Sequence, residues 1–247
     1  MRWSDEGIVI GTKRFGESHL IASVLTRSHG RHLGLARENA KMVSAFQPGT
    51  KLALLWKARL AEHLGTWSGD SIFSPLADVL ENGVLLTALG SACALAEIAL
   101  PERQPHPNVY DAFHHFMYAL GTTAWPDAYI HLERVLLANA GITLDFSHCV
   151  ATGTTEDLIY LSPRTGRAVS REAGTPYHDK LLPLPLFLTQ TLDQNTERKA
   201  EDILNALDMM ETFLSRFILG VDHLKMPEAR ERLKAKLRRQ QQRARVA

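Results

Sequence analysis

The first 67 residues alternate apolar and polar side chains in five short runs, and this pattern constrains the fold more than any other feature of the chain. Turn residues separate the runs at Gly16, Gly30 and Pro48-Gly49. Such breaks between runs of β-branched, leucine and aromatic residues are typical of consecutive antiparallel strands. The fourth and fifth runs are joined almost without a loop. The predicted strands are residues 7–15, 19–27, 31–39, 50–58 and 59–67.

Five short antiparallel strands match a small closed barrel of the OB type, whose open face and loops bind oligonucleotides or oligosaccharides. The alternative is a small barrel that only packs against the rest of the chain. Charge favours binding, because residues 1–67 hold ten Lys/Arg and five Asp/Glu, a net of +5, whereas the whole chain is +1. Clustered cations gain affinity for a phosphate backbone by releasing its counterions. The pattern therefore predicts a partner with phosphates.

Three blocks in this part of the chain resemble a known family. They are DEGIVIGTKRFGES, LTRSHGRHLGLAR and FQPGTKLALLWKARLAEHLGT, in that order and with their turn glycines. They resemble the N-terminal domain of the RecO family of DNA repair and recombination mediator proteins. A later block, from Leu132-Glu133 through Gly141 to His148-Cys149, resembles that family's junction between helical and C-terminal domains. The resemblance covers residues 5–155 well and the remainder loosely.

The length of 247 residues and the 45% hydrophobic composition predict a globular, multidomain α+β chain. Two cysteines form no disulfide framework, and the amino terminus lacks an apolar signal region, so we expect a reducing cytoplasm. The longest nearly uncharged run is too short to cross a membrane. The predicted domains are an OB-fold DNA-binding domain at 1–70, a helical domain at 71–145, a C-terminal subdomain at 146–224 and a basic tail at 225–247.

Residues 68–145 hold two basic and nine acidic side chains, a net of −7. Their apolar positions recur at intervals of three and four, which is typical of helices. This segment is therefore predicted to be a small helical domain whose negative field repels nucleic acid. The predicted helices cover residues 82–96, 109–120 and 126–140, and Gly121 and Gly141 follow the last two.

Two features are predicted in residues 146–224. A short hairpin turns at 162–166, a run of good turn residues, between strands at 158–161 and 167–169. A long helix follows over 196–219, with Thr196 as its N-cap.

The tail from Lys225 carries nine basic and two acidic residues, a net of +7. A solvated helix is the alternative for any such run. A second basic segment in a chain with a basic barrel favours contact with phosphate. We therefore predict that this tail is a basic helix that binds DNA together with the barrel.

The resembled family often carries a zinc module with two C-x-x-C pairs. In this chain the first pair keeps Cys149 but has Thr152 at its second position, and the second pair maps onto Ser170 and Ala173. Structural zinc takes four ligands in a tetrahedron. We therefore predict no metal and no other cofactor, and a zinc-less, degenerate zinc-finger-like subdomain held by apolar contacts, with Cys149 as a buried small hydrophobe.

Common enzyme motifs are missing from the sequence, which lacks H-E-x-x-H, G-x-x-x-x-G-K-[ST], G-x-S-x-G and G-x-G-x-x-G. Adjacent His114 and His115 face different sides of a helix, and His131 and Glu133 also diverge. We therefore predict no catalytic residues and no enzymatic activity. A metal-dependent enzyme that uses some of the eleven histidines is the remaining enzymatic alternative.

Basic residues at strand ends and in loops can reach a phosphate backbone without distorting a sheet, although each is as readily a solvated side chain. The family often has a glycine-and-basic segment after the third strand, whereas this chain has Glu38-Asn39-Ala40 there. Candidate stacking platforms, for which barrel core is the favoured alternative, are Phe15, Phe46, Trp56 and Trp67. Candidate DNA-binding residues are Lys13, Arg14, Arg27, Arg31, Arg37, Lys41, Lys57, Arg59, Lys234, Lys236, Arg238 and Arg239.

The resemblance also implies partners and a function. Members of the family bind single- and double-stranded DNA, anneal complementary strands and, with RecR, help RecA displace single-stranded-DNA-binding protein (SSB). They engage the acidic C-terminal tail of SSB, for which His131 and Arg134 are the candidate contacts here. We expect such a mediator, in a bacterial cytoplasm and associated with the nucleoid. The non-enzymatic alternative is a generic OB-fold protein that binds RNA or single-stranded DNA.

Overall fold

The computed structural model describes the chain except for residues 38–43, 61, 190–195, 221–222 and 247. The described residues form two compact units, and the predicted helical segment 71–145 is divided between them. The division into four predicted domains stays a prediction. Unit 1 comprises Met1–Gly121 and Pro227–Arg230, and unit 2 comprises Thr122–Met226 and Glu231–Ala247.

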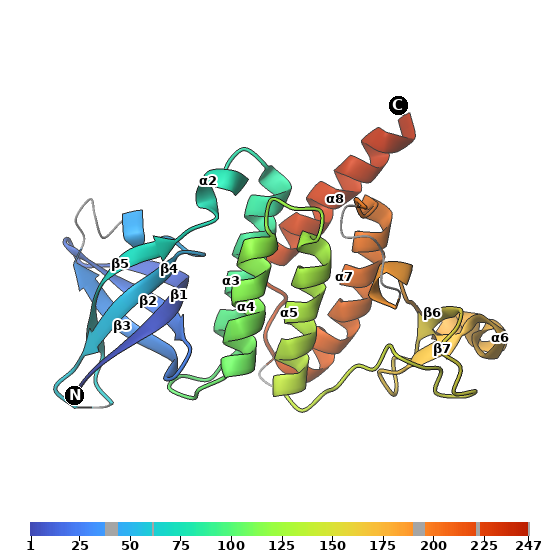
Figure 1. The fold of residues 1–247 in the computed structure, drawn as a ribbon, viewed down its shortest axis with the longest axis horizontal. Coiled ribbons are helices and arrows are strands. Elements are labelled where there is room, and N and C mark those ends of the chain that lie inside the picture. The colour runs from blue at the N-terminus through green and yellow to red at the C-terminus, as the bar shows by residue number, and fades with distance from the viewer. Residues whose placement is uncertain (38–43, 61, 190–195, 221–222, 247) are drawn as a thin grey trace. The chain divides into compact units, whose positions relative to one another are not determined.

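Five strands of unit 1 close into a barrel, drawn in blue and cyan in Figure 1. The order around the barrel is β1-β2-β3-β5-β4, and all neighbours are antiparallel except β3 and β5. The first half of β1 pairs with β4 and its second half pairs with β2. The strands are β1 Arg2–Phe15, β2 His19–Thr26, β3 Gly30–Arg37, β4 Lys51–Lys57 and β5 Gly65–Phe73.

Two tryptophans fill the interior of the barrel. Trp56 and Trp67 are 1% and 4% exposed and pack against alternate residues of β2, such as Ala22 and Val24. A buried indole N–H needs an acceptor. Each finds one on the barrel backbone, because Trp56 donates to the carbonyl of Leu33 and Trp67 to that of Ala22, both over 3.2 Å. Both indole rings are therefore fixed parts of the barrel core.

The predicted fifth strand at residues 59–67 is wrong. Strand β5 begins at Gly65, and Leu60 and Leu64 before it are 43% and 42% exposed. The polar run after Trp67 forms the strand instead, because it pairs with β4 from Thr66 to Phe73 and closes the barrel. Strand β1 also begins earlier than predicted, at Arg2, since its first half pairs with β4.

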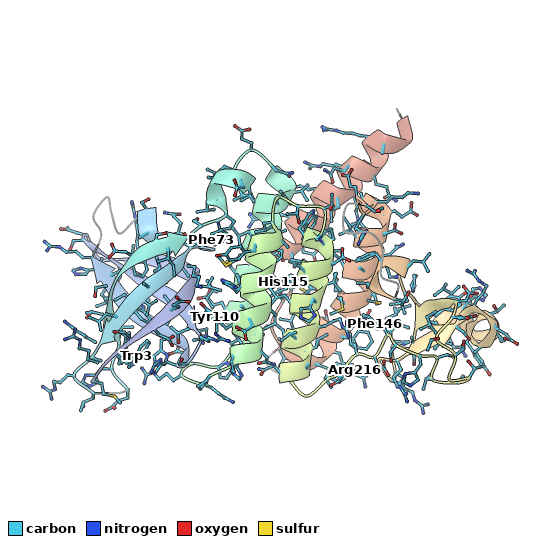
Figure 2. All side chains as sticks on the ribbon, in the orientation of Figure 1. Trp3, Phe73, Tyr110, His115, Phe146 and Arg216 are labelled. Atoms are coloured by element: carbon cyan, nitrogen blue, oxygen red, sulfur yellow. The ribbon has the colours of Figure 1, made fainter. Side chains whose placement is uncertain are left out.

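Helices follow the barrel in unit 1. The side chain of Asn82 caps α3 by accepting hydrogen bonds from the backbone N–H groups of Val84 and Leu85. Phe73, labelled in Figure 2, lies at the end of β5. Its ring stacks on Tyr118 of α4 with ring centroids 4.1 Å apart, so barrel and helix share an aromatic contact. The helices are α2 Leu76–Val79, α3 Gly83–Ala99 and α4 Pro107–Ala119.

Unit 2 combines helices with a small sheet. The predicted hairpin is confirmed, because β6 and β7 pair antiparallel, and a third strand that was not predicted, β8, joins β6. The predicted N-cap at Thr196 is wrong: α7 begins at Ala200 after Lys199 and continues as a π-helical turn, η3. Its elements are α5 Trp125–Asn139, β6 Leu158–Leu161, β7 Ala168–Ser170, α6 Arg171–Gly174, η1 Thr175–Lys180, β8 Leu182–Pro183, η2 Leu186–Leu188, α7 Ala200–Leu214 and η3 Ser215–Leu219.

The last helix, α8 Glu228–Val246, begins in unit 1 and runs through the basic tail in unit 2, which confirms the predicted basic helix. Among the helices that the structure describes, none is both long and apolar enough to cross a membrane.

Candidate nucleic-acid interface

The β1–β2 hairpin and the end of β3 bring three exposed side chains into one row. Phe15 pairs with His19, and His19 pairs with Arg37. Residues directly opposite on antiparallel strands project from the same face. Lys13 shares this face, two residues before Phe15, and Phe15 itself is 53% exposed. We call Lys13, Phe15, His19 and Arg37 the hairpin strip; it sets one exposed ring among cations.

Arg14 lies between Lys13 and Phe15 in the sequence, so its side chain projects from the opposite face of β1. It pairs with Leu20, which pairs in turn with Ala36, and both of these residues are buried. Arg14 is nevertheless exposed. The tight turn that follows contains Gly16 at φ +64°, a backbone conformation that favours glycine.

Two further predicted cations border the connection between β4 and β5. Lys57 is the last residue of β4 and Arg59 follows it, and both are exposed. Arg103, from the connection between α3 and α4, donates hydrogen bonds to the carbonyls of Glu62 and His63 over 3.0 and 3.3 Å. The sequence analysis missed this role of Arg103. The sequence did offer one indication of this role, because Arg103 is one of only two basic residues in the acidic segment 68–145.

Arg27 and Arg31 lie where the barrel meets the helices of unit 1. The Nε of Arg31 donates to the carbonyl of Leu100 over 2.8 Å, its Nη2 is 3.7 Å from Glu102, and its side chain is only 14% exposed. Arg27 forms a 3.1 Å ion pair with Asp111. The acidic helical segment thus binds cations of the barrel. Both of these predicted DNA contacts already interact with groups of the chain itself.

Three of the four candidate stacking platforms are core residues. Phe46, Trp56 and Trp67 are at most 4% exposed, which confirms the favoured alternative for them and leaves Phe15 as the exposed ring of that set. Lys41 and the Glu38-Asn39-Ala40 segment lie outside the described residues.

The tail residues divide by their position on α8. Lys234 is 5% exposed, and its Nζ lies 2.7 Å from Asp208 and 2.5 Å from Glu211 on α7. Burial acts to lower the pKa of Lys234, but hydrogen bonds from its ammonium group to these two carboxylates raise it above the usual value. Lys236 is half-buried, whereas Arg238 and Arg239 are exposed.

The candidate protein contacts lie on α5. His131 is exposed. Arg134 is half-buried, donates to the carbonyl of Leu144 over 3.1 Å and lies 4.3 Å above the ring centre of Phe146. Burial lowers the pKa of Arg134, against the attraction of Asp145. Its guanidinium therefore holds the segment that follows α5.

Cys149 is 1% exposed, which confirms the prediction of a buried side chain. Burial acts to raise the pKa of its thiol, but hydrogen bonds with Ser170 and Thr152 lower it to about 6. The backbone N–H of Ser170 donates to its Sγ over 3.3 Å. Within the described part of the chain, no group of three or more His, Cys, Asp or Glu side chains is arranged to hold a metal ion. The prediction of no zinc stays a prediction.

Known proteins resemble the chain over nearly its whole length. A family model described as "Recombination protein O N terminal" matches residues 1–74, and one described as "Recombination protein O C terminal" matches residues 80–226. A protein of Rhodospirillum centenum named DNA repair protein RecO is 43% identical, covering 94% of this chain and 93% of its own. A relative of the same name from Methylocella silvestris is 39% identical over 99% of each chain. The chain therefore belongs to the RecO family, a family of non-enzymatic mediators of DNA repair and recombination.

Proposed function

We propose that this protein binds DNA through an OB-type barrel, anneals complementary strands and, with RecR, helps RecA displace SSB during recombinational repair. The observation that carries the proposal is the hairpin strip, an exposed ring between exposed cations on strands β1 to β3. In OB folds, the face of strands two and three and the loops after strands one and four bind oligonucleotides. Family membership supports a role in DNA repair.

Within this interface, cations and rings have different tasks. Lys13, Arg14 and Arg37 neutralise backbone phosphate, and Lys57 and Arg59 extend the same surface along the β4–β5 connection. Phe15 provides a flat face on which a base stacks, a contact that tolerates any sequence. Phosphate neutralisation also lets a second strand approach, while stacked bases keep their pairing edges accessible.

The proposed partners are single- and double-stranded DNA, RecR, the SSB tail and, indirectly, RecA, and the proposed compartment is the cytoplasm. For the SSB tail, the proposal rests on the family resemblance and on the two candidate residues of α5. Of these two residues, His131 is exposed, whereas Arg134 is half-buried and lies above the ring of Phe146.

The test is a fluorescence anisotropy titration of a labelled single-stranded oligonucleotide at several salt concentrations, followed by a strand-annealing assay. The test variant combines Lys13→Ala, Arg14→Ala and Arg37→Ala. The slope of log affinity against log salt is expected to become shallower by about 2, because each lost phosphate contact on a single strand removes about 0.7. Annealing is expected to slow with it.

A matched control removes three exposed cations of unit 2 outside the basic tail, namely Arg164, Lys180 and Lys199, and is expected to leave affinity and slope unchanged. Equal behaviour of the two triple variants would show that neither the hairpin strip nor the neighbouring Arg14 forms the interface. The same titration with a matched RNA oligonucleotide separates the alternative of an RNA-binding module, which requires tighter binding of RNA than of DNA.

A further inference from the structure

Helix α8 presents four basic residues along one face. Arg232, Lys236, Arg239 and Arg243 are spaced by four, three and four residues, which places them in one stripe of an α-helix. At 1.5 Å per residue, the stripe is roughly 16 Å long. No acidic residue follows Glu231 in the helix. The stripe is therefore a continuous cationic ridge.

The opposite face of α8 is fixed to its own unit. Leu233 and Leu237 are at most 1% exposed, and Lys234 between them is bound to Asp208 and Glu211 of α7. The helix is thereby held in one rotational setting. Asp208 also lies 4.0 Å from the Nη2 of Arg238, a residue outside the stripe.

The chemistry of the stripe fits a phosphate backbone. Three of the four side chains are arginines, whose planar guanidinium groups match phosphate oxygens in a bidentate geometry. The helix contains no aromatic residue, so it offers no platform for an unstacked base. The hairpin strip, in contrast, combines cations with the exposed ring of Phe15. The two surfaces therefore contact nucleic acid in different ways.

We propose that the stripe Arg232, Lys236, Arg239 and Arg243 is a second nucleic-acid site, which binds the phosphates of another strand or duplex without reading its bases. This inference rests on the proposed function, in which the hairpin strip binds the first strand. One molecule then holds two nucleic acids at once, which raises their effective concentration for each other. Lys234 is a structural residue in this scheme and makes no contact with DNA.

The test uses the full chain and two non-complementary oligonucleotides, one carrying a donor dye and the other an acceptor. The test variant changes all four stripe residues to alanine, which preserves helix propensity. Wild type is expected to show energy transfer between the oligonucleotides. The variant is expected to bind a single oligonucleotide still, to lose most of the energy transfer, and to anneal complementary strands at least about tenfold more slowly, in line with typical gains from linked sites.

Two control variants separate charge from structure. The triple change of Gln240, Gln241 and Gln242 to alanine alters the same helix without removing charge, and is expected to behave as wild type. Lys234→Met is expected to lower the unfolding midpoint in urea while leaving the salt slope of DNA binding unchanged. Circular dichroism checks that the helix persists in each variant.

If the stripe variant showed the same energy transfer and annealing rate as wild type, the inference would be overturned. The proposed function would still stand in that case, provided that the wild-type protein binds DNA. Absence of DNA binding by wild type would refute both. If the stripe variant lost binding of a poly-glutamate probe but kept energy transfer, the stripe would be a site for an acidic protein segment, and the nucleic-acid assignment would be wrong.

Discussion

The Nε of Arg31 donates a 2.8 Å hydrogen bond to the carbonyl of Leu100, whereas Arg37, on the same face of the same strand, is exposed. The two residues are six positions apart, or about 20 Å along an extended strand. One end of β3 is therefore covered by the connection after α3, and the other end is open. Two arginines that look equivalent in the sequence have different tasks.

Arg31→Met is expected to destabilise the fold without changing DNA binding. Its guanidinium is mostly buried and bonds to Leu100, so its removal leaves a carbonyl without a partner, at about 1.5–3 kcal/mol for a bond to a charged group. Urea unfolding measures this loss, and the salt slope of DNA affinity should stay at the wild-type value. Arg37→Met is the control, with stability within about 0.5 kcal/mol of wild type and a shallower slope. A loss of stability in Arg37→Met, together with a shallower salt slope in Arg31→Met, would contradict these different roles of the two arginines.

Phe15→Ala is expected to weaken binding of single-stranded DNA by about 1–3 kcal/mol, the usual contribution of one stacked base. The salt slope should not change, because no cation is removed. Stability should hardly change either, since the ring is 53% exposed. Anisotropy titration measures the affinity, and Tyr177→Ala, which removes a 60% exposed ring from unit 2, is the control. Equal affinities for the two variants would exclude stacking on Phe15.

Gly30→Ala is expected to destabilise unit 1 more than Gly16→Ala. Both glycines have a positive φ, at +74° and +64°, so both substitutions incur about 1–2 kcal/mol of backbone strain. A Cβ at Gly30 would in addition lie 1.9 Å from the backbone oxygen of Gln104, whereas nothing lies within 4 Å at Gly16. We expect a loss of at least about 3 kcal/mol for Gly30→Ala in urea unfolding. Similar losses of stability for both variants would mean that the backbone at Gln104 moves away from the added Cβ at little energetic cost.

Stability is expected to fall as the pH drops from 7 to 5, in part because of His32. Burial, with repulsion from Arg103, lowers the pKa of His32 from 6.5 to about 4. Between these values the unfolded chain binds a proton that the folded chain does not, so acid favours unfolding, by about 2 kcal/mol at pH 5. Urea unfolding at both pH values measures this.

His32→Gln is the matched variant for the pH experiment. It removes the titrating ring and should make the difference between pH 7 and pH 5 smaller by that amount. An unchanged difference would show that His32 is protonated in the folded protein near its ordinary pKa, despite its position beside Trp3 and Trp56.

Much of the fold and the family could be predicted because local patterns specify them. Alternation and turn glycines located the first four strands, and the intervals of three and four located α3 to α5. The family matches confirm the predicted membership and the non-enzymatic role. The fifth strand was displaced because its polar sequence becomes a strand only through pairing with β4. The start of α7 was predicted too early because Thr196 resembles a capping residue locally, whereas the helix begins at Ala200.

The sequence by itself determined that the chain has a five-stranded segment, two basic ends around an acidic middle, and the residues of a RecO family member. Only the tertiary structure decided which cations face solvent. Arg31 and Lys234 are bound by groups from elements distant in the sequence, whereas Arg37 and Arg239 are exposed. The physical reason is that a charge becomes available to a ligand only when no folded segment covers or neutralises it, and that depends on long-range packing.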